Sequence, residues 1–246
     1  MKSLLRMVAV AAVCMAAAGC CGAKGHSAPE KIRVACIGDS ITFGTAMTNR
    51  VAECYPAQLQ RILGDRYEVR NFGDPGAGVY LHTKRGDRPR AWRLRDEYAP
   101  ALAFKPDIVV CNLGINDAST YMGEYIHSED GKAKLERGLF RKLYVDLLES
   151  FANDGCRPRF IIWTKLGPTG KKHHFKGMPY AFVMEHDLEQ VARDVGAETL
   201  DMYTPLVPFA ETPHFSSDGI HPEAGAQKVI AEITAAKIQG RPAPVR

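Results

Sequence analysis

The chain has 246 residues, 46% of them hydrophobic and 24% charged, which suits one α/β domain with a sizeable core or at most two small domains. The net charge of +4 is mild and the basic residues are scattered, so the sequence shows no nucleic-acid-binding footprint of clustered Lys and Arg interleaved with aromatic residues. The 7 cysteines follow no Cys-x-x-Cys or Cys/His spacing, and nothing suggests a metal site.

The amino-terminal segment predicts export. A charged start is followed by a short apolar run over residues 7–18, too short for a membrane span with these flanks. Ala17-Ala18-Gly19-Cys20 resembles the lipobox of a bacterial lipoprotein, which implies that Cys20 becomes an acylated amino terminus. The alternative is an ordinary secretory signal and a secreted protein. We expect a cell-envelope lipoprotein on the periplasmic or surface face, with a signal peptide over 1–19, a tether over 20–31 and a folded domain over 32–240.

Strands and helices alternate along the folded part. Short apolar or alternating runs predict strands at Ile32–Cys36, Tyr67–Phe72, Ile108–Leu113, Arg159–Thr164 and Glu198–Met202. Helical periodicity and stop signals predict helices at Tyr55–Leu63, 133–152, Tyr180–Val195 and Pro222–Ala236. Residues 80–98 read as a surface excursion with a short helix, and 204–217 as irregular. Connections of this length favour a parallel sheet covered on both faces, an α/β/α sandwich.

Cysteines in the predicted strands have a structural interpretation. Cys36 and Cys111 lie in buried strands, where we expect them to pack as small hydrophobes. A disulfide is compatible with export, but the sequence selects no pair.

Three candidate functional residues fall just past predicted strand ends: Ser40, Gly76 and Asn116. In open parallel sheets, sites form outside the carboxyl ends of the strands. We therefore expect these three residues to share one edge of the sheet.

Ser40 is the candidate nucleophile, although a serine or aspartate at this place can also simply cap a helix. A serine hydroxyl needs a neighbouring base near neutral pH. His221 is the candidate base because Asp218 precedes it by three residues, and a tight turn can bring the carboxylate onto Nδ1. The alternative is that Asp218 caps the last helix and His221 lies on the surface.

Acyl transfer also needs hydrogen-bond donors for an oxyanion. The backbone N–H of Ser40, the N–H of Gly76 in the Gly/Pro-rich stretch 73–78, and the side-chain amide of Asn116 are the candidates. Turn geometry alone also explains the glycine and the asparagine.

Together these residues resemble the SGNH (GDSL-type) hydrolase family over about residues 32–236. The matching blocks, in the family's order, are Gly38-Asp39-Ser40, Gly76 after Asn71, Gly114-x-Asn116-Asp117 and Asp218-x-x-His221. The resemblance implies a flavodoxin-like α/β/α sandwich and ester hydrolysis through an acyl-serine, without metal or organic cofactor. It also implies that Ser40 is the nucleophile, His221 the base and Asp218 its orienting acid, with the Ser40 amide, Gly76 and Asn116 forming the oxyanion hole.

A finer resemblance points to the bacterial sialate O-acetylesterase-like branch, which acts on acetylated glycans. Its carriers are Asn49-Arg50, Tyr55-Pro56-Ala57-Gln58-Leu59 and Asn71-Phe72-Gly73. Asp74-Pro75 departs from that branch, which usually has a small residue before the glycine, and the departure can shift the oxyanion turn.

The expected partner is a small-molecule or glycan ester, with membrane contact through the lipid anchor only and no nucleic acid. The basic loop 165–176 indicates either a negatively charged substrate or a solvated surface. Two other functions remain: a lysophospholipase or short-chain lipase with the same catalytic residues, and a non-catalytic, glycan-binding surface lipoprotein.

Overall fold

The computed structural model describes residues 30–80, 84–85, 87–117, 137–152, 157–165, 180–210 and 218–243. The chain divides into two units, Met1–Glu30 and Lys31–Arg246, and the second contains the fold. The predicted signal peptide, the lipobox with Cys20 and the basic loop after residue 165 lie outside the described residues. Within the described ranges, no helix has both the length and the apolar character needed to cross a membrane.

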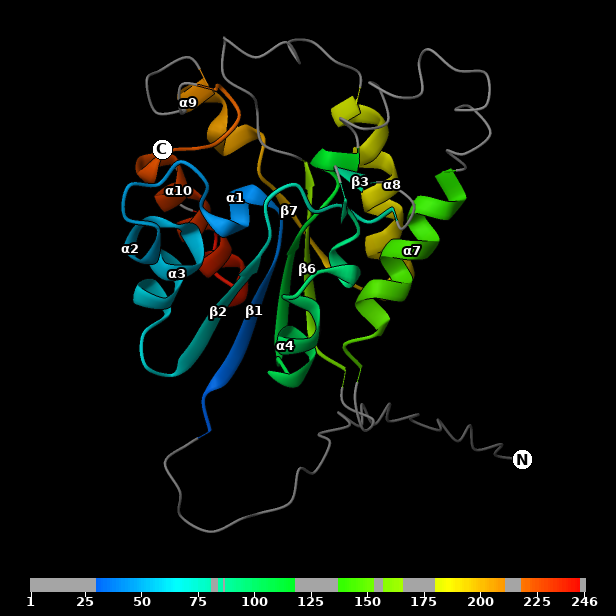
Figure 1. The fold of residues 1–246 in the computed structure, drawn as a ribbon. Coiled ribbons are helices and arrows are strands. Elements are labelled where there is room, and N and C mark those ends of the chain that lie inside the picture. The colour runs from blue at the N-terminus through cyan, green and yellow to red at the C-terminus, as the bar shows by residue number, and fades with distance from the viewer. Residues whose placement is uncertain are drawn as a thin grey trace, which may run out of the picture. The chain divides into compact units, whose positions relative to one another are not determined.

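A parallel five-stranded sheet forms the centre of this unit, in the order β2-β1-β5-β6-β7 (Figure 1). Its strands are β1 Ile32–Gly38, β2 Tyr67–Gly73, β5 Ile108–Asn112, β6 Arg159–Lys165 and β7 Glu198–Asp201. A small antiparallel pair, β3 Lys84–Arg85 with β4 Arg88–Pro89, stands apart from it. Strand β2 lies at one edge of the sheet beside β1, and β5, β6 and β7 follow in order on the other side of β1. This is the flavodoxin-like order, so the predicted fold class is confirmed.

Helices cover both faces of the sheet (Figure 1). The helices are α1 Ser40–Phe43, α2 Arg50–Glu53, α3 Tyr55–Leu63, α4 Tyr98–Ala103, α7 Arg137–Glu149, α8 Tyr180–Val195, α9 Val207–Ala210 and α10 Ala224–Ile238, with single 3₁₀ turns η1 Trp92–Leu94 and η2 Thr204–Leu206. One face carries α2, α3 and α10, and the other carries α4, α7 and α8.

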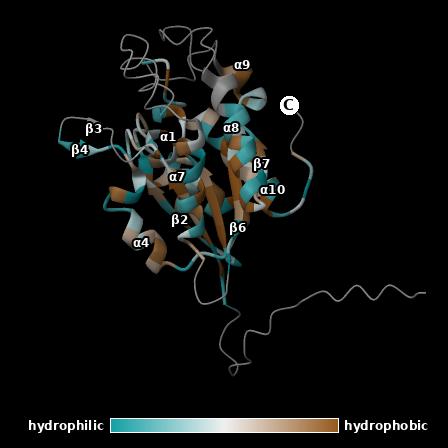
Figure 2. Cartoon of the chain, turned by 90° about the vertical axis from the view of Figure 1, so that its right-hand side faces the viewer, coloured by the Kyte–Doolittle hydropathy of each residue, from teal (hydrophilic) through white to brown (hydrophobic). Residues whose placement is uncertain are grey.

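Alternate residues of each central strand enter two separate cores. In β1, Val34 and Cys36 join the core beneath α3 and α10, whereas Ala35 and Ile37 join the core beneath α7 and α8. A strand buried on both faces needs an almost continuous apolar run. Figure 2 shows this pattern, with brown strands inside and teal residues on the outer side of α7 and α8.

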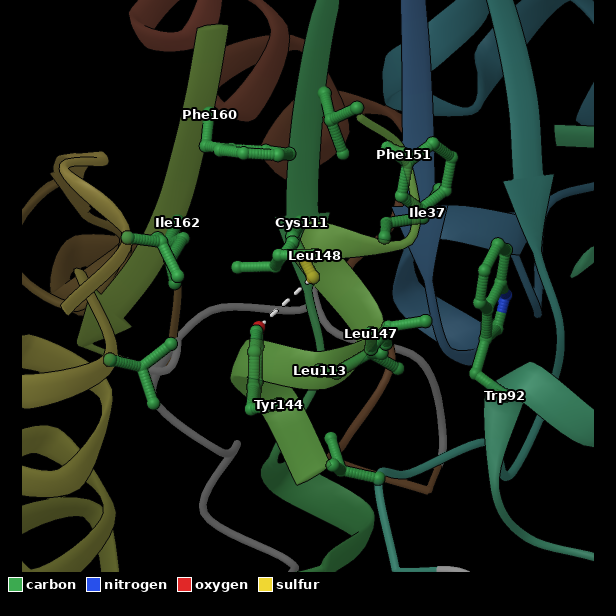
Figure 3. Packing of buried hydrophobic residues seen from close by; sticks show 14 of the residues in the cluster. Ile37, Trp92, Cys111, Leu113, Tyr144, Leu147, Leu148, Phe151, Phe160 and Ile162 are labelled. Carbon is green, nitrogen blue, oxygen red and sulfur yellow. Dashed lines mark hydrogen bonds between the residues drawn. The ribbon is translucent and has the colours of Figure 1, made fainter. Parts of the chain in front are cut away.

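The core beneath α7 contains a polar contact inside apolar packing (Figure 3). The Tyr144 hydroxyl lies 3.0 Å from Sγ of Cys111, and both residues are fully buried. Burial raises the pKa of the Cys111 thiol to about 12. Cys36, Cys54 and Cys111 are free thiols, and the expected packing of Cys36 and Cys111 as small hydrophobes is confirmed.

Two local predictions are wrong. Trp92, placed on a surface excursion, is 0% exposed, and its Nε1 donates to the Phe72 carbonyl at 2.9 Å. The residues around Trp92 in the sequence are mostly polar, so its burial could not be predicted from them. The stretch after residue 203, expected to be irregular, forms η2 and α9 before the described range ends at residue 210.

Candidate active site

Ser40 is the first residue of α1, directly after the carboxyl end of β1. Asp39 caps this short helix, with Oδ1 accepting the Ile41 N–H at 2.9 Å. The helix can pack on the end of β2 only because residue 73 is glycine, since a Cβ there would lie 2.2 Å from the Phe43 nitrogen. The Ser40 side chain is partly exposed. Among the described residues, neither its hydroxyl nor its backbone N–H has a hydrogen-bond partner.

The strand register brings three predicted site segments to one edge of the sheet. Gly38 at the end of β1 pairs with Gly73 on one side and with Asn112 on the other. Ser40, Gly76 and Asn116 each follow one of these level strand ends. Their edge is the switch point of the sheet, where the strand order reverses and where ligands bind in such folds.

Asp218 and His221 form the expected contact. Asp218 Oδ2 lies 2.6 Å from Nδ1 of His221, while Oδ1 accepts the backbone N–H groups of Ile220 at 2.9 Å and His221 at 3.2 Å. Both carboxylate oxygens therefore hold the ring and its backbone in one orientation. A neutral imidazole that donates Nδ1–H to the carboxylate keeps Nε2 as an acceptor. The His221 side chain is 15% exposed, which leaves it accessible to a substrate.

Helix α10, which follows His221, is bonded to the helix that carries Ser40. The Gln227 side chain is fully buried; its Nε2 donates to the Ile41 carbonyl at 3.1 Å and its Oε1 accepts the Tyr55 N–H at 2.8 Å. In the described part of the chain, no hydrogen bond joins the His221 ring to the Ser40 hydroxyl. Such bonds often tighten only when substrate is present.

Gly76 lies in a tight turn over Asp74–Ala77. The Ala77 N–H donates to the Asp74 carbonyl at 3.0 Å, and Gly76 has a φ of 79°. Proline at the second position and a left-handed glycine at the third are the pattern of a type II turn. The Gly76 N–H meets no protein acceptor within the residues described. It therefore remains available to a ligand.

The segment after β5 clamps this turn from the other side. Asn116 Nδ2 donates to the Ala77 carbonyl at 2.9 Å, so the amide is held against the residue after Gly76. Asp117 Oδ1 accepts the N–H groups of Val79 at 2.7 Å and Tyr80 at 3.0 Å. These hydrogen bonds join the segment that carries Asn116 to the segment that carries Gly76.

Two buried carboxyls lie beneath the site. Burial raises the pKa of Asp39 to about 7, because the charged form loses its water, and the nearby Asp117 carboxyl adds to the rise. Burial likewise raises the pKa of Asp117. Among the residues that the structure describes, one oxygen of each group, Oδ2, has no hydrogen-bond partner. In the described ranges, no group of three or more His, Cys, Asp or Glu side chains is arranged to hold a metal ion.

Sequence reasoning missed two of the residues that organise this site. Gln227 is the only residue of α10 with a side-chain amide, and it lies on a face otherwise filled by small and aliphatic residues. A single amide on such a face is the sequence signal that could have identified it. Asp117 stands next to Asn116 in a matched block, but only the structure shows that it ties the Gly76 segment down.

Fold and site together define the class. The chain belongs to the GDSL-like lipase/acylhydrolase family, whose model matches residues 36–229. Members of this class are carboxylic ester hydrolases.

The chain is similar to proteins named as carbohydrate acetylesterases. An acetylxylan esterase of Xylanibacter ruminicola is 32% identical over 231 residues, covering 88% of this chain and 45% of the relative, so the chain spans less than half of that protein's length. The solved acetyl xylan esterase AlAXEase superposes with a TM-score of 0.61 at 18% identity, covering 84% of this chain and 100% of its own. Est24, a carbohydrate acetylesterase from Sinorhizobium meliloti, superposes with a TM-score of 0.58 at 18% identity, covering 85% of this chain and 99% of its own. At these identities the two structures show the shared fold alone.

Proposed function

We propose that this chain is a serine esterase that removes O-acetyl groups from carbohydrates through an acetyl-serine intermediate. The observation that carries the proposal is the Asp218–His221 contact of 2.6 Å, on a segment whose following helix is bonded through Gln227 to the helix of Ser40. A base with a fixed ring and a serine with an unengaged hydroxyl are the two parts that nucleophilic ester cleavage requires.

In the first half-reaction, Oγ of Ser40 attacks the acetyl carbonyl carbon while Nε2 of His221 accepts the hydroxyl proton. The tetrahedral intermediate collapses, the bond to the sugar oxygen breaks, and that oxygen leaves with the proton from His221. In the second half-reaction, water loses a proton to His221 and attacks the acetyl-serine, which releases acetate and restores Ser40. Asp218 stays ionised and stabilises the imidazolium formed in each half.

The negative charge on the intermediate needs donors aimed at it before the reaction starts. The N–H groups of Ser40 and Gly76 have no protein acceptor within the described residues, which suits them for this role. The Asn116 amide completes the set. Its bond to the Ala77 carbonyl holds the group beside Gly76.

The choice of sugar is the finer part of the proposal. The sequence resembles the sialate O-acetylesterase-like branch, whereas the curated relative is named as an acetylxylan esterase. Both substrates present an acetyl ester on a carbohydrate hydroxyl. Acetate release from acetylated xylan fragments and from O-acetylated sialic acid, measured side by side, separates the two.

The first experiment uses p-nitrophenyl acetate with the wild type, Ser40→Ala and Ser150→Ala. Ser150 is a matched control because its hydroxyl donates to Leu147 in the last turn of α7, in a different part of the fold. We expect Ser40→Ala to lower kcat at least ~10⁴-fold, since loss of the nucleophile disables both half-reactions. Ser150→Ala should retain wild-type kcat. Full activity in Ser40→Ala refutes the assignment.

A chain-length series of p-nitrophenyl esters tests the lipase alternative. A carbohydrate acetylesterase prefers acetyl, whereas a lipase or lysophospholipase gains activity as the acyl chain lengthens. A non-catalytic glycan-binding protein turns over none of these esters.

We also propose that the protein is exported and anchored through a lipid on Cys20, on the strength of the lipobox-like residues that precede it. Metabolic labelling with an alkyne fatty acid tests this. Label in the wild type and none in Cys20→Ala is expected, and an unlabelled wild type contradicts it.

A further inference from the structure

The turn that carries Gly76 starts at a buried carboxylate, Asp74. The Asp74 N–H donates to the Gly38 carbonyl at 2.9 Å, which places the start of the turn beside the end of β1. The Asp74 carbonyl then accepts the Ala77 N–H and closes the turn. The Asp74 side chain is 4% exposed. Any movement of this residue is therefore passed to Gly76.

Two arginines balance the Asp74 charge. Nη2 of Arg88 lies 2.6 Å from Oδ2, and Nη1 of Arg95 lies 3.5 Å from Oδ1. A buried carboxylate without a partner is costly, so these contacts decide where the side chain settles. The Arg95 side chain is buried at 2% exposure, whereas that of Arg88 is 52% exposed. Arg88 supplies the shorter contact and reaches it from the surface.

The segment after Arg88 holds the far side of the same turn. The Gly78 N–H donates to the Arg90 carbonyl at 2.8 Å, and the Trp92 N–H donates to the Gly78 carbonyl at 2.8 Å. Together with the Arg88–Asp74 pair, these bonds fix both ends of the Gly76 segment to one neighbouring stretch of chain.

We propose that Asp74 and Arg88 are positioning residues that set the direction of the Gly76 N–H in the oxyanion hole. The inference rests on the proposed esterase function. Neither side chain contacts the reacting atoms; both act through the turn. An oxyanion donor is effective only at about 2.7–3.1 Å from the developing charge. A small rotation of the turn therefore reduces the stabilisation of the transition state more than it reduces the affinity for the substrate.

The test compares Arg88→Ala with Arg70→Ala. The two arginines are matched, because Arg70 lies 2.6 Å from its carboxylate partner Glu68 and is 54% exposed. Arg70 belongs to β2, however, and makes no contact with the Gly76 turn among the described hydrogen bonds. On p-nitrophenyl acetate we expect Arg88→Ala to lower kcat about 10-fold with KM changed less than about 2-fold. Arg70→Ala should keep both constants.

A second readout isolates the oxyanion. The thionoester analogue, with sulfur in place of the carbonyl oxygen, develops charge on an atom that accepts hydrogen bonds poorly. An intact hole therefore favours the oxygen ester, and a misaligned one loses that preference. We expect the ester-to-thionoester ratio of kcat/KM to fall in Arg88→Ala and further in Asp74→Asn, which keeps the size of the side chain but not its charge.

Each outcome decides the matter. Equal kcat in Arg88→Ala and Arg70→Ala, or an unchanged ester-to-thionoester ratio in both Arg88→Ala and Asp74→Asn, overturns the positioning role while leaving the esterase intact. A raised KM with unchanged kcat overturns it too, since Arg88 would then bind substrate directly. A wild type that hydrolyses no ester overturns the proposed function instead, and the two failures are thereby distinguished.

Discussion

Replacement of Gln227 by leucine should both destabilise the fold and slow the reaction. The substitution puts an apolar side chain of similar size in place of the amide and leaves two buried groups without partners, the Tyr55 N–H and the Ile41 carbonyl. Each unsatisfied buried group costs ~1–3 kcal/mol, so we expect the free energy of unfolding to fall by about 3 kcal/mol. For a domain of this size that corresponds to a fall in Tm of about 6–12 °C.

Urea unfolding and thermal melts measure the stability change, and kcat is measured well below the variant's Tm. Because Gln227 joins α10 to the residue after Ser40, we expect kcat to fall about 10-fold in the folded variant. Gln60→Leu is the matched control, since its side chain bonds Gly64, Tyr67 and Val69 around the amino end of β2, away from the site edge. That variant should lose stability and keep kcat.

Either of two results contradicts this role of Gln227. A loss of less than about 1 kcal/mol in Gln227→Leu means that the two bonds are replaced at no cost. A kcat that falls no further than in Gln60→Leu means that α10 does not position His221 relative to Ser40.

Three further changes test separate features. Because burial raises the pKa of Asp39 to about 7, the stability its proton contributes is fully present below pH 4 and is lost as the pH rises through 7; Asp39→Asn, which stays neutral, should gain up to ~4 kcal/mol on the wild type between pH 4 and 8 in urea titrations, and parallel pH profiles would contradict this. Asp218→Asn should lower kcat for p-nitrophenyl acetate by ~10⁴-fold without abolishing it, because the His221 ring loses its charged partner, and an unchanged kcat would exclude the orienting role. Tyr144→Phe removes the hydroxyl beside Cys111 Sγ and should cost ~1 kcal/mol with kcat unchanged, whereas a loss above ~3 kcal/mol would show that more than this weak bond is broken.

Strand and helix positions were readable because burial imposes a regular pattern on them. The helices Tyr55–Leu63 and Tyr180–Val195 have the predicted bounds, since an apolar stripe and a closing glycine mark both. The run Ile108–Asn112 was clear because both of its faces are buried. The burial of Trp92 was not predicted, because the residues that it contacts, Phe72 and Phe151, are distant in sequence.

The candidate site was predictable where chemistry is local in sequence. Asp218 and His221 are three residues apart, and one turn is enough to bring them into contact. The supports of the site are not local: Gln227 reaches Ile41 and Asp74 reaches Arg95, and no pattern within one element signals such pairs. The strand register that levels Gly38 with Gly73 and Asn112 is likewise a tertiary property.

The central claim is that Ser40 is an activated nucleophile, and covalent labelling tests it most directly. The protein is incubated with a fluorophosphonate, digested, and mapped by mass spectrometry, with Ser40→Ala treated in parallel. The account predicts a single phosphonyl adduct on the peptide that contains Ser40 and none on the variant. An unlabelled wild type, or an adduct that persists at the same rate in Ser40→Ala, would contradict it.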